Sequence, residues 1–491
     1  MDSRLGGNDG VKFNNVDLFK TNNPMSRSLA LDALRGIAIL LMVFSSRIPF
    51  GVLPEWMYHA QVAPPLHIFD GTVPGITWVD LVFPYFLFAM GAAIPLALHA
   101  RLEKGEAFLK IAASIFKRGA LLFFFAVYVM HIRPTVMSAT PGFYEYALSF
   151  VGFMLLFPML VKLPEHWAIN RKIITRAIGW GGAIAVLILF RAKDGKLFDL
   201  ARSDIIILVL ANVAVTGSFI WIATRKRLDI RIGILAFLFA LRLTQSIPGW
   251  GQWLWNLSPA PWIGTVYFQQ YLFIIIPGTI AGDLLLKFAK AASTAPANAS
   301  HRLWAICAAG PLLTLWLLFL LKERFVIAAT VGAIIICVGG WALLHQTKNQ
   351  PKTEAEKIIR SLFGWGIFWL LLGLAFEPYE GGIKKDRATM SYYFVTSGLA
   401  FFTLITLMIA IDIARIRRGF GLMIATGQNP LVAYAGVQSF LPPILAVTGI
   451  GAWIQSFTMT PWAGAARGAF YTGLLAYVGA WCSKRGLFLR T

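Results

Sequence analysis

The sequence predicts an all-α protein, a polytopic integral membrane bundle of about 11–14 transmembrane helices with both termini in the cytoplasm. The first observation is composition. Of the 491 residues, 57% are hydrophobic and only 14% are charged, whereas a soluble domain carries about 25% charged residues. The second is that apolar stretches of about 17–25 residues recur along the whole chain. The third is that basic residues gather in alternate connections, as the positive-inside rule predicts.

Candidate spans are recognised by apolar runs long enough to cross a hydrocarbon core. We expect some of these spans to be broken or re-entrant. They begin near residues 29, 78, 109, 144, 175, 204, 231, 265, 303, 325, 361, 393, 422 and 464.

The connections between these spans set the expected topology. The uncharged, Trp-rich loop 249–264 is typical of an outer interface, whereas the loop 191–204 carries charges of both signs and departs from the alternation. We expect residues 1–27 to be a polar cytoplasmic segment, residues 28–491 a single transmembrane domain, and 47–77 an extracytoplasmic loop. The basic connections are Arg101–Lys104, Arg171–Lys172, Arg225–Arg227, Lys287–Arg302, Lys348–Arg360, Arg415–Arg418 and Lys484–Arg485.

The formal net charge of +21 is explained by these loops, so no nucleic acid partner is predicted. The three cysteines, Cys307, Cys337 and Cys482, lie in apolar segments without metal-ligand spacing. We therefore expect small apolar residues in helices there, and no metal cofactor.

The stretch HIFDGTVPGITWVDLVFPYF, residues 67–86, places ionisable groups at the mouth of a span. An ionised side chain at a helix centre costs about 2.5–3.5 kcal/mol, so Asp80 needs a partner or a water-filled cavity. It can simply be an acid at a helix start, where the helix dipole favours it. The alternative is that Asp80 orients an imidazole for proton or acyl transfer. His67 is then the candidate base, and His59 competes with it.

Other polar residues have structural explanations beside functional ones. Asp32 and Arg35 share a helix face as an i, i+3 pair, and Asn429 precedes Pro430 where a helix cap explains it. Lys384 belongs to a charge run at a helix entrance, on the side where positive residues are sparse. Positive-inside bias explains Arg118, which could also hold phosphates. Arg242 is polar near an outer helix end, where it could line a cavity.

Several stretches together resemble the heparan-α-glucosaminide N-acetyltransferase family and its bacterial relatives of unknown function. They span about residues 28–440, and VDLVFPYFLFAMG is the most specific. The others are SLALDALRGIAILLMVF, the residues around that motif in GITWVDLVFPYFLFAMGAAIPLAL, IIIPGTIAGDLL, IKKDRATMSYYFVTSGLAFF and GQNPLVAYAG.

The resemblance implies a transmembrane acyltransferase that passes acetyl from cytoplasmic acetyl-CoA to the amino group of a glucosamine across the membrane. His67 and Asp80 match the family's active histidine and its aspartate. The spacing between them is longer than in the lysosomal enzymes, so His59 stays a candidate. Ser46 stands where those enzymes carry asparagine, which puts donor alignment and the identity of the acyl group in doubt.

The leading hypothesis is a bacterial inner-membrane acyltransferase for an amino or hydroxyl group of a sugar or glycan. Transfer could proceed through an acyl-His67 intermediate or directly with His67 as base. Acyl-CoA, the acceptor and membrane lipid are the expected partners, and a homodimer is left open. The alternatives are a secondary transporter of a sugar or anionic metabolite, against which the lack of internal repeats counts, and a non-catalytic glycan- or lipid-binding relative. The candidate residues are His67, Asp80 and alternatively His59 for catalysis, Lys384, Asn429, Arg242 and Asp70 for substrate, and Arg35, Arg118 and Ser46 for acyl-CoA.

Overall fold

The computed structural model describes residues 28–490 apart from 52, 259, 261–264, 292–298 and 346–352. The predicted cytoplasmic segment 1–27 lies outside the described residues, as do parts of the loops 249–264, 287–302 and 348–360. The helices are α1 (Leu29–Ser45), α2 (Trp78–Glu103), α3 (Phe108–His131), α4 (Pro134–Met137), α5 (Phe143–Leu160), α6 (Ile169–Leu189), α7 (Ile205–Thr224), α8 (Leu228–Thr244), α9 (Trp250–Trp255), α10 (Val266–Gln269), α11 (Leu272–Ala291), α12 (His301–Lys322), α13 (Val326–His345), α14 (Glu354–Ala375), α15 (Met390–Leu407), α16 (Gly421–Gln428), α17 (Pro430–Ser439), α18 (Leu441–Val447), α19 (Ile450–Phe457) and α20 (Pro461–Lys484).

The fold class is confirmed. The described part of the chain is helical, and an isolated β-bridge joins Val161 to Leu489. It contains 11 helices long and apolar enough to cross a membrane. Short 3₁₀ turns at Glu55–Met57 and Tyr379–Gly381 and a π-helical turn at Met408–Ile413 complete the elements. The side of the membrane on which the termini lie stays a prediction.

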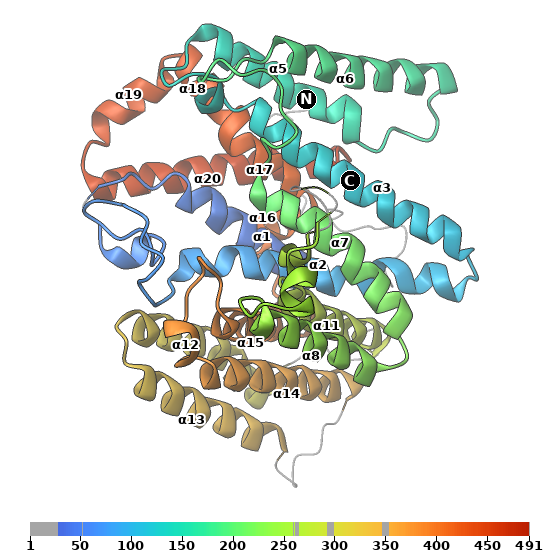
Figure 1. The fold of residues 1–491 in the computed structure, drawn as a ribbon, viewed down its shortest axis with the longest axis vertical. Coiled ribbons are helices and arrows are strands. Elements are labelled where there is room, and N and C mark those ends of the chain that lie inside the picture. The colour runs from blue at the N-terminus through green and yellow to red at the C-terminus, as the bar shows by residue number, and fades with distance from the viewer. Residues whose placement is uncertain are drawn as a thin grey trace, which may run out of the picture.

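Figure 1 shows α1 and α2 in the middle of the bundle, with α5 and α6 at one edge and α12 and α13 at the other. The central packing joins α2 to α11 and to α1, α1 to α16, and α14 to α15. The most enclosed candidate span is Met390–Ile413, with 89% of its apolar window buried. The connection that carries His59 and His67 leaves α1 and returns into α2, at the C-terminal end of one central helix and the N-terminal end of the next.

Four predicted span starts differ from the structure. Those near residues 175 and 361 lie six and seven residues after the true starts of α6 at Ile169 and of α14 at Glu354. The segment near residue 265 opens as the short helix α10, and the long helix α11 begins at Leu272. The segment near residue 422 is the eight-residue helix α16, and the chain breaks at Asn429 before α17 and α18. Pro430 begins α17, where the absence of an N–H costs nothing, and Pro442 and Pro443 fall in the first turn of α18 for the same reason.

Glycines let α1 and α16 approach until their backbones touch. A Cβ added to Gly36 would lie 1.8 Å from the Met423 carbonyl oxygen, and one added to Gly427 would lie 1.7 Å from the Asp32 carbonyl oxygen. Small residues at such crossings are the usual way to pack membrane helices closely. The contact fixes the N-terminal half of α1 against α16.

We predict that Gly427→Ala destabilises the protein, because the new methyl group must push α16 away from α1. Overpacking of this kind costs about 1–3 kcal/mol or more, so the unfolding midpoint in detergent should fall by about 5 °C. Gly421→Ala, in the same helix, is the matched control because a Cβ there meets nothing within 4 Å. Equal midpoints for the two variants would contradict this account of the crossing.

Candidate active site

The first turn of α2 is closed by a capping box. The Thr77 hydroxyl oxygen accepts from Val79 N–H, and Oδ2 of Asp80 accepts from Thr77 N–H at 2.9 Å. The Asp80 side chain is fully buried. A carboxylate at this position is stabilised by the helix dipole and by the N–H groups that the helix leaves unpaired. Part of the reason for an acid here is therefore structural.

The other carboxylate oxygen of Asp80 holds His59. The two atoms, His59 Nδ1 and Asp80 Oδ1, are 2.7 Å apart, and Ala60 N–H donates to Oδ2 at 3.2 Å. Because a carboxylate only accepts, Nδ1 carries the proton and Nε2 keeps its lone pair in the neutral ring. The His59 side chain is 37% exposed. The arrangement is an oriented imidazole on a buried acid, with its second nitrogen able to accept a proton.

His67, the histidine expected to pair with Asp80, lies elsewhere. Its Nδ1 is 3.3 Å from the Val62 carbonyl oxygen and its Nε2 is 3.4 Å from that of Gly51. The ring packs edge-on against Phe50 and Tyr58. The expected His67–Asp80 pairing is therefore corrected to a His59–Asp80 pairing.

The physical reason is the path of the chain before α2. The Thr77 hydroxyl donates to the Tyr58 carbonyl oxygen at 2.6 Å, which ties the backbone next to His59 to the cap of α2. Buried Gln61 continues the tie through bonds from its Nε2 to the carbonyl oxygens of Val73 and Gly75. His67 lies between Gln61 and Val73, within the loop that these bonds close, and its backbone is left-handed at φ 49°.

Lys385 approaches the same imidazole from the segment before α15. Its Nζ lies 3.2 Å from Nδ1 and 3.4 Å from Nε2 of His59. The Tyr392 hydroxyl, in the first turn of α15, donates to the Asp80 carbonyl oxygen at 2.8 Å. Asp80, His59 and Lys385 thus form one cluster, which we call the acid–imidazole–lysine cluster.

Arg242 holds the Lys385 segment in place. Its Nη2 donates to Glu380 Oε1 at 2.7 Å and to the Ala388 carbonyl oxygen at 2.6 Å. Glu380 in turn accepts from Met390 N–H at 2.7 Å. Arg242, expected to bind substrate, therefore positions the segment. The Lys384 side chain is directed toward Gly381, since a Cβ there would lie 3.4 Å from Lys384 Nζ.

Asp70 and Asn429, the remaining residues expected to bind substrate, have different surroundings. Asp70 is exposed, and hydrogen bonds from the Thr72 side chain and backbone lower the pKa of its carboxyl group. Asn429 is buried, donates to the Leu487 carbonyl oxygen and accepts from Leu489 N–H. It fastens the C-terminal segment and is not part of the cluster.

The residues expected to bind the acyl donor fall into two places. Arg35 Nη1 donates to the Gly427 carbonyl oxygen at 3.1 Å, and the Arg118 guanidinium lies near enough for the two positive charges to interact. Within the part of the chain that the structure describes, the buried Nε of Arg118 has no hydrogen-bond partner. Ser46 lies past the other end of α1 and donates to the Val43 carbonyl oxygen. Two neighbouring guanidinium groups can accommodate phosphates.

Sequence reasoning missed Lys385. The signal was the run IKKDR before α15, which is expected on the side of the membrane where positive residues are sparse. Adjacent lysines leave open which side chain turns inward. The clamp by Arg242 and Glu380, together with the bonds between Lys384 and Thr389, fixes the path of the segment and so the direction of each lysine.

The chain is similar to two curated proteins over a short region. Heparan-alpha-glucosaminide N-acetyltransferase of Mus musculus is 31% identical over 106 residues, which are 22% of this chain and 14% of that protein. The Homo sapiens protein of the same name is 31% identical over 106 residues, 21% of this chain and 14% of its own length. The chain thus matches only about a seventh of the length of these relatives. A family model described as a domain of unknown function, DUF5009, matches residues 27–285. Since that match covers more than half of the sequence, the chain belongs to the DUF5009 family.

Proposed function

We propose that this protein is a membrane-embedded acyltransferase. It moves an acyl group, acetyl in the simplest case, from acyl-CoA in the cytoplasm to an amino or hydroxyl group of a sugar or glycan on the opposite side. The observation that carries the proposal is the His59 imidazole held by the buried Asp80 carboxylate at 2.7 Å. The short similarity to two N-acetyltransferases supports the same reaction class.

His59 acts as the general base. An ammonium acceptor first loses a proton to water, and the amine nitrogen then attacks the thioester carbonyl carbon. A C–N bond forms while the carbonyl electrons move to oxygen, and His59 Nε2 takes one of the two N–H protons, so that the other stays on the amide nitrogen. Collapse of the tetrahedral intermediate breaks the C–S bond, and the proton on Nε2 passes to the sulfur to give a free thiol and an amide. Asp80 orients the ring and stabilises the imidazolium that forms.

Lys385 supplies the positive charge for the oxygen. Its ammonium lies 3.4 Å from Nε2, beside the place where the carbonyl oxygen becomes negative. A fixed cation in a site of low dielectric stabilises such an oxyanion strongly. Lys384, which the sequence suggested as a substrate-binding residue, takes no part in this step of the proposal.

The donor reaches this cluster along α1. Arg35 and Arg118 hold its phosphates at the N-terminal half of the helix. Ser45, at the other end, is ten residues from Arg35, about 15 Å at the rise of an α-helix. An extended pantetheine arm can span such a distance, which brings the thioester toward Ser46 and His59.

Residues 28–491 form one catalytic unit in this proposal, placed in the inner membrane of a bacterium. Acyl donor and acceptor then meet without either molecule crossing the bilayer. The acid–imidazole–lysine cluster faces the acceptor side, and the pair of arginines faces the donor side.

We predict that His59→Ala lowers acyl transfer to glucosamine by about 10²–10⁴-fold, the usual contribution of a general base. His67→Phe should retain most of the activity, because the new ring preserves the packing on Phe50 and Tyr58. The measurement is thiol release from acetyl-CoA by purified protein in liposomes with glucosamine on the other side. Full activity in His59→Ala together with loss in His67→Phe would return the role of base to His67. Sugar uptake without thioester consumption would instead identify a transporter.

We predict that Lys385→Met lowers kcat by about 10²-fold with a small change in KM, because it removes charge stabilisation from the transition state. Lys385→Arg should restore a large part of kcat, since a guanidinium also donates to an oxyanion. A change in KM alone would show that Lys385 binds the acceptor and has no part in the chemical step.

We predict that Arg118→Ala raises KM for acetyl-CoA by about tenfold, because a charge-assisted contact to phosphate is lost. The KM for S-acetylpantetheine, which has no phosphate, should be the same in this variant and the parent. Lys117→Ala, at the exposed neighbouring residue, is the matched control. An equal loss with both donors would argue against phosphate recognition by Arg118.

A further inference from the structure

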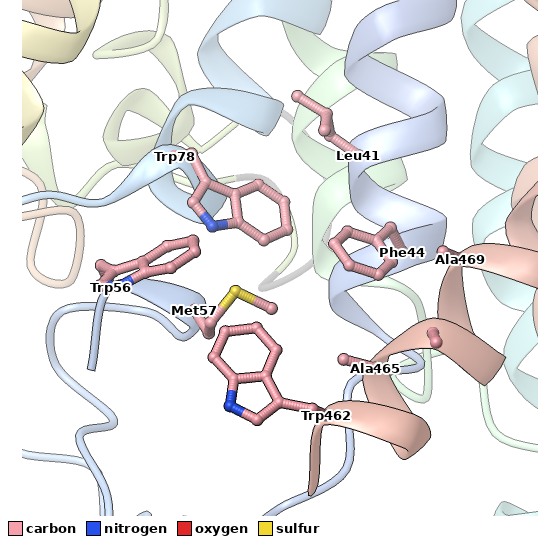
Figure 2. Close-up of a pocket in the computed structure, with 9 residues that line it drawn as sticks. Leu41, Phe44, Trp56, Met57, Trp78, Trp462, Ala465 and Ala469 are labelled. Carbon is pink, nitrogen blue, oxygen red and sulfur yellow. The ribbon is translucent and has the colours of Figure 1, made fainter. Parts of the chain in front are cut away.

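An apolar pocket of about 460 Å³ is lined in part by Met57 and Trp78, which are each two residues from a member of the acid–imidazole–lysine cluster. Figure 2 shows its aromatic walls, with Trp56, Trp78 and Trp462 around Met57 and the ring of Phe44 opposite. Trp78 stacks on Phe44 with ring centroids 5.6 Å apart. Small residues of α20, such as Ala469, leave the space open on the remaining side. A cavity of this size and lining suits an aliphatic chain.

The mouth of the pocket lies in a belt of exposed aromatic residues. Trp56 and Trp462 are themselves exposed, and the neighbouring helix α19 exposes Trp453 and Phe457 and buries none of its residues. Short helices with exposed aromatic side chains lie at the boundary between lipid and water. An occupant therefore enters from the membrane, which selects a lipid chain over a water-soluble molecule.

The pocket and the cluster share the same two stretches of chain. Met57 precedes His59 by two residues, and Trp78 precedes Asp80 by two. The capping box and the bond from Thr77 to the Tyr58 carbonyl oxygen fix these stretches to each other. The pocket and the cluster are therefore neighbours along both stretches, and a head group attached to a chain in the pocket has only a short distance to span to reach His59.

The segment before α15 brings positive charge close to that head group. The segment before α15 carries Lys384, Lys385 and Arg387 against one acid, Asp386. Lys385 already touches the imidazole. Charge complementarity favours an anionic linkage between the sugar and the chain.

We propose that the acceptor is lipid-linked: an amino sugar joined through a phosphate to an aliphatic chain, with the chain in the Trp-lined pocket. This proposal rests on the proposed acyltransferase function and names its substrate class. The donor's own acyl chain is the other conceivable occupant. The pocket does not favour it, because its mouth opens to lipid at the end of α1 opposite Arg35, whereas the donor enters beside Arg35.

The test compares glucosamine 1-phosphate with its dodecyl ester as acceptors, using the full-length protein in liposomes. The dodecyl chain already partitions into the bilayer, so moving it into the pocket adds little hydrophobic free energy. The pocket is expected to raise the rate mainly by positioning the sugar. The ratio of kcat/KM for the ester to that for the free sugar phosphate should fall by about tenfold in Ala469→Phe, which fills the pocket. Gly473→Phe, one helical turn further along α20, should keep the parent ratio because a Cβ there meets nothing within 4 Å.

A second measurement does not depend on turnover. A dodecyl ester that carries a diazirine on its chain should label the residues around Trp462 in the parent, and this labelling should disappear in Ala469→Phe. The proposal would be overturned if the parent transferred acyl groups to glucosamine, showed no preference for the dodecyl ester over the free sugar phosphate, and carried no label in the pocket. The acyltransferase function would then still stand. Pocket labelling without any acyl transfer would remove the proposed function and leave only a lipid site. If Ala469→Phe changes the preference among donor acyl chains and not among acceptors, the pocket belongs to the donor and the proposal fails.

Discussion

The buried charge of Asp80 is the constraint around which this end of the molecule is arranged. A carboxylate taken out of water at the mouth of a membrane helix is costly unless each oxygen is paired. One oxygen is neutralised by backbone N–H groups of Thr77 and Ala60, and the other by His59. Satisfying the acid thereby fixes the start of α2, the backbone of the preceding loop and the orientation of an imidazole. The bonds that stabilise the fold here are the ones that orient the proposed base.

The sequence predicted the class of fold because the bilayer imposes length and hydropathy on every span. Most helix starts were predicted within a few residues for that reason. The broken region from α16 to α18 was harder to predict. Prolines indicate where a helix can begin, but they do not determine how the short helices pack against one another. The close crossing at Gly36 and Gly427 could not be predicted either, because a glycine in an apolar run does not indicate which helix packs against it.

The sequence predicted which residue types would occupy the candidate site, but it did not predict which of these side chains would contact one another. The sequence identified Asp80, both histidines and the outer positive run. Choosing His59 over His67 required the path of the loop, which depends on a side chain bonded to a distant carbonyl group. Choosing Lys385 over Lys384 required the clamp by Arg242 and Glu380, two residues separated by more than a hundred positions. Asn429 was expected to bind substrate from its sequence context. In the structure its side chain instead makes hydrogen bonds to the C-terminal segment.

The clamp by Arg242 has a consequence for the setting in which the protein is handled. Arg242 belongs to α8, whose Phe237 and Leu243 are exposed on the surface of the bundle, where a membrane protein meets lipid. Yet its guanidinium holds the Ala388 carbonyl oxygen, three residues from Lys385. The position of Lys385 relative to His59 therefore depends in part on a helix with an exposed face. The tilt of this helix depends on its packing against neighbouring helices and on the thickness of the surrounding bilayer or detergent belt. The environment of the protein thereby becomes part of the geometry of the cluster.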